Sequence, residues 1–221
     1  MNPIPLSSRR RPALGTAGFS ITEFMVTMII SLALSAAGWM FYRTQLRSLG
    51  DQSADLDAGE GARAAMGFMA RELRVAAYDP QGTALTTAGA KGISDARSNR
   101  LLVQWDANSS GTIDPNAVDP NAESVLYTYD PSLRQVLRTA AGNTQTLIKN
   151  VPSIGLAFEY FDGNGDPLTP SGNPAQLTAA QRDAVAVILV KLQVETFRAT
   201  RVRAVKLSAR AALRNRVLGR L

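Results

Sequence analysis

The sequence predicts an α+β fold in which one long N-terminal helix packs on an antiparallel β-sheet. The first observation is an apolar run over residues 18–42, GFSITEFMVTMIISLALSAAGWMFY, which holds a single charge, Glu23. The second is the absence of proline between Pro12 and Pro80, which allows a helix to continue well past this run. The third is a series of short strand-like runs, separated by turn residues, in the second half of the chain.

The chain opens with a basic leader, residues 1–18. This leader contains three arginines, Arg9 to Arg11, and no acidic residue. The long apolar run follows the small residue Gly18, whereas a secretory signal carries its apolar region before the cut site. We therefore expect cleavage after Gly18 to leave a membrane anchor. Because basic residues stay on the cytoplasmic side, the rest of the chain should face the periplasm of a Gram-negative cell.

Residues 19–43 are expected to form the transmembrane and assembly helix. The stretch from Phe24 to Tyr42 would be about 28 Å long at ~1.5 Å per residue, close to the thickness of the hydrocarbon core. Arg43 would then lie just outside one interface, next to three aromatic residues of the kind that gather there: Trp39, Phe41 and Tyr42. The pattern predicts a single-pass protein of the inner membrane.

Residues 44–78 are expected to form the amphipathic half of the same helix. Apolar residues keep three- and four-residue spacing before and after a shift at Gly59 and Gly61. The members of this stripe are Leu46, Leu49, Leu56, Met66, Met69, Leu73 and Ala76. We expect the second half of the stripe to pack on the domain that follows.

Residues 79–221 are expected to form a β-sheet domain. The Gly, Thr, Ala and Pro content of residues 79–99 predicts a surface connection. A hairpin turn is expected at Asp130, Pro131 and Ser132. The predicted strands are 101–105, 125–129, 135–138, 146–148, 154–161, 184–194 and 201–209.

Composition argues against several classes of function. The chain has 221 residues and a net charge of +6, and half of that excess comes from the three leader arginines. The only clustered basic stretch, residues 198–220, alternates with apolar residues, so we expect no nucleic-acid partner. No cysteine or histidine occurs, which excludes disulfides, the usual structural zinc sites and histidine-based catalysis. We therefore expect a protein that is not an enzyme and has no cofactor.

The acid inside the apolar run requires a partner. A carboxylate in a bilayer helix costs roughly 2.5–3.5 kcal/mol on insertion scales. Cleavage after Gly18 would give Phe19 a free α-amine, four residues from Glu23 on one helix face. The alternative is an ordinary signal anchor with a chance acid.

The basic leader, Gly18, Phe19 and Glu23 together resemble the N-terminus of the type IV prepilins. This resemblance implies that prepilin peptidase cuts after Gly18 and that Phe19 becomes the methylated terminus. It also implies that Glu23 compensates the terminal amine of a neighbouring subunit during filament assembly. Thr22 departs from the aliphatic residue that usually precedes this acid.

Two further segments resemble minor pilins of the PilW kind: RELRVAAYDPQG at residues 71–82 and AALRNRVLGR at 211–220. The resemblance implies a type IV pilin-like fold and a minor pilin that initiates or supports pilus assembly. Its implied partners are other minor and major pilins and the inner-membrane assembly platform. The J-type pseudopilin of type II secretion has the same anchor and a similar layout, so it remains an alternative. A membrane-anchored adhesin, binding through loops 80–100 and 162–182, is another.

One loop, DANSSGTID, has the spacing of a partial calcium site. Oxygen-bearing side chains alternate along it, at Asp106, Asn108, Ser110 and Asp114. Ala117 stands where a bidentate glutamate is expected, so a calcium ion would bind weakly. A shorter cluster, Asp162, Asn164 and Asp166, has the same oxygen-rich composition. The alternative for both is an ordinary turn between strands.

Overall fold

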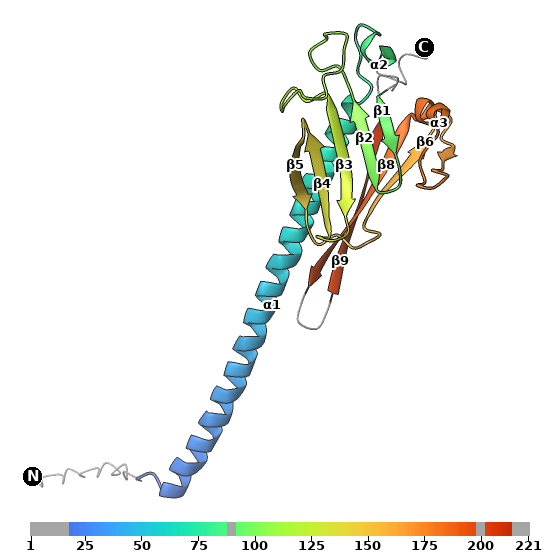
Figure 1. Ribbon diagram of the computed structural model, residues 1–221. Coiled ribbons are helices and arrows are strands. Elements are labelled where there is room, and N and C mark those ends of the chain that lie inside the picture. Colours follow the sequence, from blue (N-terminus) through green and yellow to red (C-terminus); the bar gives the residue numbers. More distant parts are fainter. Residues whose placement is uncertain (1–17, 88–91, 198–201, 214–221) are drawn as a thin grey trace, which may run out of the picture. The chain divides into compact units, whose positions relative to one another are not determined.

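The computed structural model describes residues 18–87, 92–197 and 202–213. The leader before Gly18, Arg201 and the end of the C-terminal match, residues 214–220, lie outside the described residues. The chain divides into two compact units, Met1–Gly50 and Asp51–Leu221. One long helix is followed by antiparallel β-sheets (Figure 1), so the predicted α+β class is confirmed.

Helix α1 extends over Ile21–Val75. Its last turn ends where the backbone N–H of Ala76 donates to the carbonyl of Glu72 at 3.0 Å. Ala77 then takes a positive φ of 65°, and its N–H donates to the carbonyl of Gln104 in the first sheet. The helix therefore ends three residues before the predicted position, because a strand captures the next N–H group.

Five strands form sheet A in the order in which they occur along the chain. They are β1 (Ile93–Ala96), β2 (Arg100–Gln104), β3 (Ser124–Asp130), β4 (Gln135–Ala140) and β5 (Asn143–Ile148). The predicted turn between β3 and β4 is confirmed: the N–H of Ser132 donates to the Asp130 carboxylate at 2.8 Å. Such an Asx contact closes the turn locally.

Four strands form a separate sheet B in the order β7-β6-β8-β9. They are β6 (Leu156–Phe161), β7 (Pro167–Leu168), β8 (Val187–Phe197) and β9 (Val202–Ala212). The prediction of one sheet was wrong. Each strand was read from local alternation, which does not reveal which strands pair across the chain.

The segment predicted as a surface connection, residues 79–99, contains a short helix, α2 (Ala84–Thr87), and strand β1. Ile93 and Ala96 are buried, whereas Asp95 lies between two arginines, with Arg97 Nε at 3.0 Å and Arg100 Nε at 2.7 Å. The strand was missed because its few apolar residues are mixed with polar ones whose charges are paired in the fold.

All seven predicted strands differ from the observed ones by one to three residues at one or both ends, and two of these differences have a clear local cause. Ala184 ends a helix, α3 (Ala179–Ala184), which begins with a capping box between Thr178 and Gln181. Ile154 precedes β6 and is exposed, because a turn places the Gly155 N–H on the carbonyl of Pro152 at 2.8 Å. A Cβ atom at Gly155 would lie 2.6 Å from Pro152 Cδ, so only glycine fits.

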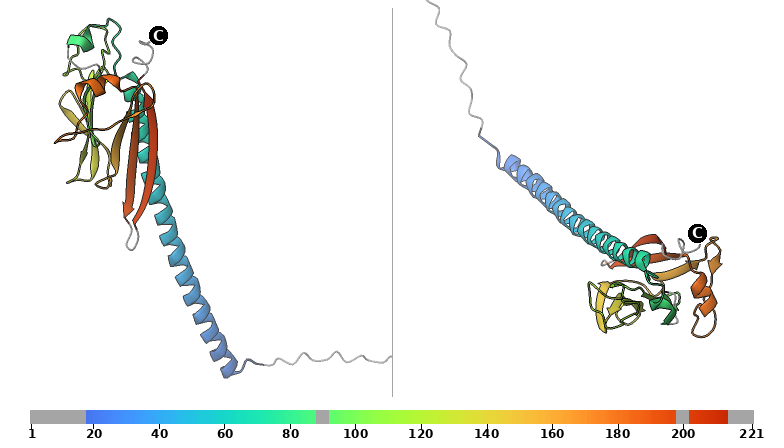
Figure 2. Two further views of the ribbon diagram at one scale, coloured as in Figure 1. Left: turned by 90° about the vertical axis from the view of Figure 1, so that its right-hand side faces the viewer. Right: turned by 90° about the horizontal axis from the view of Figure 1, so that it is seen from above.

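The core of the larger unit lies between the second half of α1 and both sheets. Four residues of the predicted helical stripe are buried there: Met66, Met69, Leu73 and Ala76. Figure 2 shows this part of α1 alongside the strands. Leu56 is exposed and Ala58 is partly buried, so burial begins near the shift at Gly59 and Gly61, and the prediction that the second half of the stripe packs on the domain is confirmed.

Candidate functional site

The start of α1 holds the three residues predicted to act in processing and assembly. Gly18 and Phe19 precede the helix, so the predicted start at residue 19 was wrong by two residues; the first turn begins at Ile21, after Ser20, and Phe19 is exposed. A Cβ atom at Gly18 would meet no heavy atom within 4 Å, and its backbone is outside the positive-φ region that favours glycine. The fold itself therefore gives no steric reason for glycine at this position.

Glu23 caps its own helix in this chain. The backbone N–H of Ser20 donates to Glu23 Oε2 at 3.0 Å, and the N–H of Thr22 approaches Ser20 Oγ at 3.4 Å. These contacts satisfy N–H groups that the first turn of a helix leaves free. The sequence analysis missed this local role, although the Ser-x-x-Glu spacing of a capping box was readable at Ser20 and Glu23.

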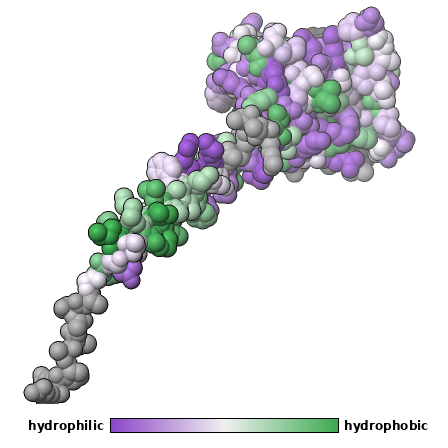
Figure 3. Space-filling model, turned by 90° about the horizontal axis from the view of Figure 1, so that it is seen from below, coloured by the Kyte–Doolittle hydropathy of each residue, from purple (hydrophilic) through white to green (hydrophobic). Residues whose placement is uncertain are grey.

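After the cap, α1 is long and apolar enough to span a membrane, and none of that stretch is buried. Figure 3 shows apolar side chains gathered on this exposed helix. Its hydroxyl groups bond to the helix backbone: Thr27 donates to the carbonyl of Phe24 at 2.9 Å, and Ser35 to that of Ser31 at 2.7 Å. Such pairing reduces the cost of placing a hydroxyl in hydrocarbon.

The loop after β2 brings Asp106 and Asn108 together around one backbone group. Both side chains accept from the N–H of Ser110, at 3.0 and 2.8 Å, and the second Asp106 oxygen accepts from Gly111 N–H at 2.9 Å. Asp106 is fully buried. Its two carboxylate oxygens therefore close the turn.

Asp114 contacts a different acid, Glu123, through its backbone N–H group. The buried Glu123 carboxylate accepts from the N–H groups of Asp114, at 2.7 Å, and Ala107, at 3.2 Å. Asp114 itself accepts from Asn116 N–H at 2.8 Å. Within the described residues, no group of three or more acidic side chains is arranged to hold a metal ion. Calcium binding here remains a hypothesis.

The second oxygen-rich cluster forms the turn between β6 and β7. The Asp162 carboxylate accepts from Asn164 N–H at 2.8 Å and from Asp166 N–H at 2.9 Å. The Asp162 N–H in turn donates to the carbonyl of Asp166 at 3.0 Å. These contacts are those of an Asx-closed turn.

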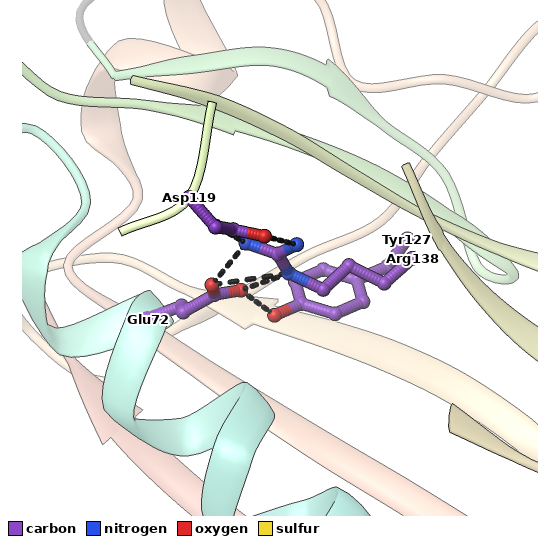
Figure 4. A network of polar contacts seen from close by, with 4 residues as sticks. All are labelled: Glu72, Asp119, Tyr127 and Arg138. Carbon is purple, nitrogen blue, oxygen red and sulfur yellow. Dashed lines mark hydrogen bonds and ion pairs between the residues drawn. The ribbon is translucent and has the colours of Figure 1, made fainter. Parts of the chain in front are cut away.

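A partly buried ion cluster joins α1 to sheet A (Figure 4), and no sequence signal indicated it. Arg138 of β4 is buried and donates from Nη2 to Glu72 of α1 at 2.7 Å and from Nη1 to Asp119 at 2.7 Å. The hydroxyl of Tyr127 donates to Glu72, and the guanidinium lies 5.3 Å from the Phe68 ring centroid.

Burial and the contacts within this cluster shift the pKa values of three of its members. Burial alone lowers the pKa of Arg138, but hydrogen bonds to Asp119 and Glu72 raise it above its ordinary value. The hydrogen bond from Arg138 holds the pKa of Asp119 below 3.8. Burial, followed by the negative charge of Glu72, raises the pKa of Tyr127. Arg138 therefore stays a cation beside an ionised Asp119, and Tyr127 stays a neutral phenol, over the physiological range.

Comparison of the chain with protein-family models, with curated proteins and with solved structures found no match.

Proposed function

We propose that this chain is a minor type IV pilin: a single-pass protein of the inner membrane that is cut after Gly18, methylated at Phe19, and incorporated into a pilus through α1. The observation that carries the proposal is the start of α1, where the single acid of a fully exposed apolar stretch, Glu23, lies five residues after a glycine that the fold does not require. The domain of residues 51–221 faces the periplasm, and its role is binding rather than catalysis.

The acid supports a filament role because its local contact supplies no counter-charge. The N–H of Ser20 satisfies one lone pair of Glu23 and brings no positive charge. In a low-dielectric environment a carboxylate needs a cation as well as hydrogen bonds. The new α-amine of Phe19, in a neighbouring copy of the same or a related subunit, supplies that cation. Other minor and major pilins are therefore its partners, with prepilin peptidase and the assembly platform acting before them.

The test separates the charge of Glu23 from its capping contact. Glu23→Ala removes both, whereas Glu23→Gln keeps an oxygen that can accept from Ser20 N–H and removes only the charge. We expect cleavage after Gly18 in both variants, because the cut site is unchanged. We expect both to be lost from sheared pili, as measured by immunoblotting of pilus fractions against membrane fractions.

If the Glu23→Gln variant enters pili normally and the Glu23→Ala variant does not, the role of Glu23 is helix capping. The proposed pairing of Glu23 with the Phe19 amine would then be wrong. The same strains distinguish the alternatives. A secretion defect with normal pili would favour the type II secretion pseudopilin, and normal pili with lost surface attachment would favour the adhesin.

A further inference from the structure

Strand β9 forms one edge of sheet B and is paired on one side only. It runs antiparallel to β8 in continuous register, from Val187 opposite Ala212 to Phe197 opposite Val202. No strand among the described residues pairs with its other side. A strand of this length is about twice the usual one. Its other side therefore carries a long row of backbone groups that no described strand pairs with, and Figures 1 and 2 show β9 next to β8.

One hydrogen bond shows which backbone groups of β9 point away from β8. The N–H of Leu213 donates to the carbonyl of Ala186 at 2.9 Å, so the backbone of odd-numbered residues along β9 faces β8. The even-numbered residues then direct their N–H and C=O groups to the free edge, and all six have exposed side chains: Val202, Ala204, Lys206, Ser208, Arg210 and Ala212. Each is in position to pair with an added strand.

Native proteins usually protect such an edge with charged side chains, a proline, a bulge or a covering element, and of the first three β9 has only the charges. Strand β9 contains no proline, and its register with β8 has no shift. It carries basic residues and no acidic ones. Basic edge residues oppose pairing with another basic strand but not with an acidic one.

Two cations on this edge lack acidic partners. Lys206 and Arg210 are four residues apart, so both lie on the outer face, about 13 Å apart at ~3.3 Å per residue. Within the described part of the chain, neither forms an ion pair, whereas Lys191 on the same face pairs with Glu159. Arg203, on the opposite face, pairs with Asp55 at 3.1 Å. The guanidinium of Arg210 lies 5.5 Å from the Phe161 ring centroid, which orients it without neutralising it.

We propose that β9 binds an extended, acidic segment of another polypeptide, which adds to sheet B as a further strand. Its backbone pairs with the even-numbered residues of β9, and two carboxylates four residues apart lie opposite Lys206 and Arg210. A second copy of this chain fits less well, because two β9 strands would bring four cations together with no acid. This binding would use sheet B alone and is separate from the proposed role of α1.

The experiment uses the full chain in detergent micelles and a short fluorescent peptide of alternating valine and threonine with two glutamates four residues apart. The control peptides have lysines in place of the glutamates, or glutamates three residues apart and so on opposite faces. We expect only the first peptide to bind, as measured by fluorescence anisotropy, and binding to weaken as salt is added. The amides of Lys206, Ser208 and Arg210 should gain protection from hydrogen exchange in the complex.

Two variants separate backbone pairing from charge. Ser208→Pro removes an edge-facing N–H and leaves the bonds to β8 in place, whereas Ser208→Ala keeps the N–H. We expect about tenfold weaker binding for the proline variant and no change for the alanine variant. The double variant Lys206→Glu with Arg210→Glu should bind the lysine peptide instead, which tests the proposal even if Ser208→Pro does not fold.

Equal binding of the glutamate and lysine peptides by the native chain would overturn the proposal. So would equal binding by a folded Ser208→Pro variant. Sedimentation of the native chain as a dimer that Lys206→Glu strengthens would show that the occupant is a second copy, and would also overturn it.

Discussion

Arg138→Met removes the cation that joins α1 to sheet A and keeps a long apolar side chain under Phe68. The remaining carboxylate of Glu72, whose side chain is 14% exposed, then keeps only the Tyr127 hydroxyl as a donor. Removing one partner of a buried ion pair costs about 3–5 kcal/mol, because the other charge stays desolvated. Since Glu72 retains some solvent, we take the lower end, about 3 kcal/mol. At about 2–4 °C per kcal/mol for a domain of this size, the Tm falls by about 6–12 °C.

The assay is thermal unfolding of the full chain in detergent, followed by circular dichroism. A second substitution makes the test specific: Glu72→Gln in the Arg138→Met background removes the uncompensated charge and should recover about 1 kcal/mol, or about 2–4 °C. A Tm within about 2 °C of the native value for Arg138→Met would refute the reasoning. A further fall in Tm on adding Glu72→Gln would refute it as well.

Acid should destabilise the domain partly through Asp119: its pKa is lowered in the folded state by Arg138, so its contribution is present above pH 3.8 and is lost as the pH falls through the folded pKa. The Tm of Asp119→Asn should therefore fall less between pH 7 and pH 3 than that of the native chain, and an equal fall would contradict this assignment. For the loop at residues 106–114, the oxygens of Asp106 and Asn108 already accept backbone N–H groups, so we expect millimolar calcium to leave the Tm unchanged. A rise that Asn108→Ala abolishes would establish the ion site instead; Asn108 is the better probe, because Asp106 is buried and its loss would disturb the turn.

The parts of the fold that depend on local pattern were predictable. The apolar run and the absence of proline predicted α1, and the Asp130 turn predicted the β3–β4 hairpin. The spacing of Met66, Met69 and Leu73 predicted the buried face of the helix. In each case residues close in sequence decide the structure.

The parts that depend on distant partners were not predictable. Nothing near Glu72 or Arg138 indicates that they meet, because their contact is set by how α1 packs on sheet A. The division into two sheets depends likewise on which strands pair, and β1 is buried by its neighbours despite a polar sequence.

The candidate site falls between these cases. The sequence predicted the exposed apolar helix and the place of Glu23 in its first turn, but it also placed Phe19 on the helix, which begins only at Ile21. The hydrogen bond from the Ser20 N–H to Glu23 was predictable from the Ser-x-x-Glu spacing, although the sequence analysis considered only the charge of Glu23. The turn-closing role of Asp106 needed the structure, since calcium loops and Asx turns use the same residue types.

Mass spectrometry of the mature N-terminus tests the central claim most directly. The protein is isolated from native membranes and from pili, and its N-terminal peptide is sequenced. The account predicts a chain that begins with N-methylated Phe19, and an uncleaved chain when Gly18 is replaced by a bulky residue. A native chain that retains Met1 and the leader would contradict the account.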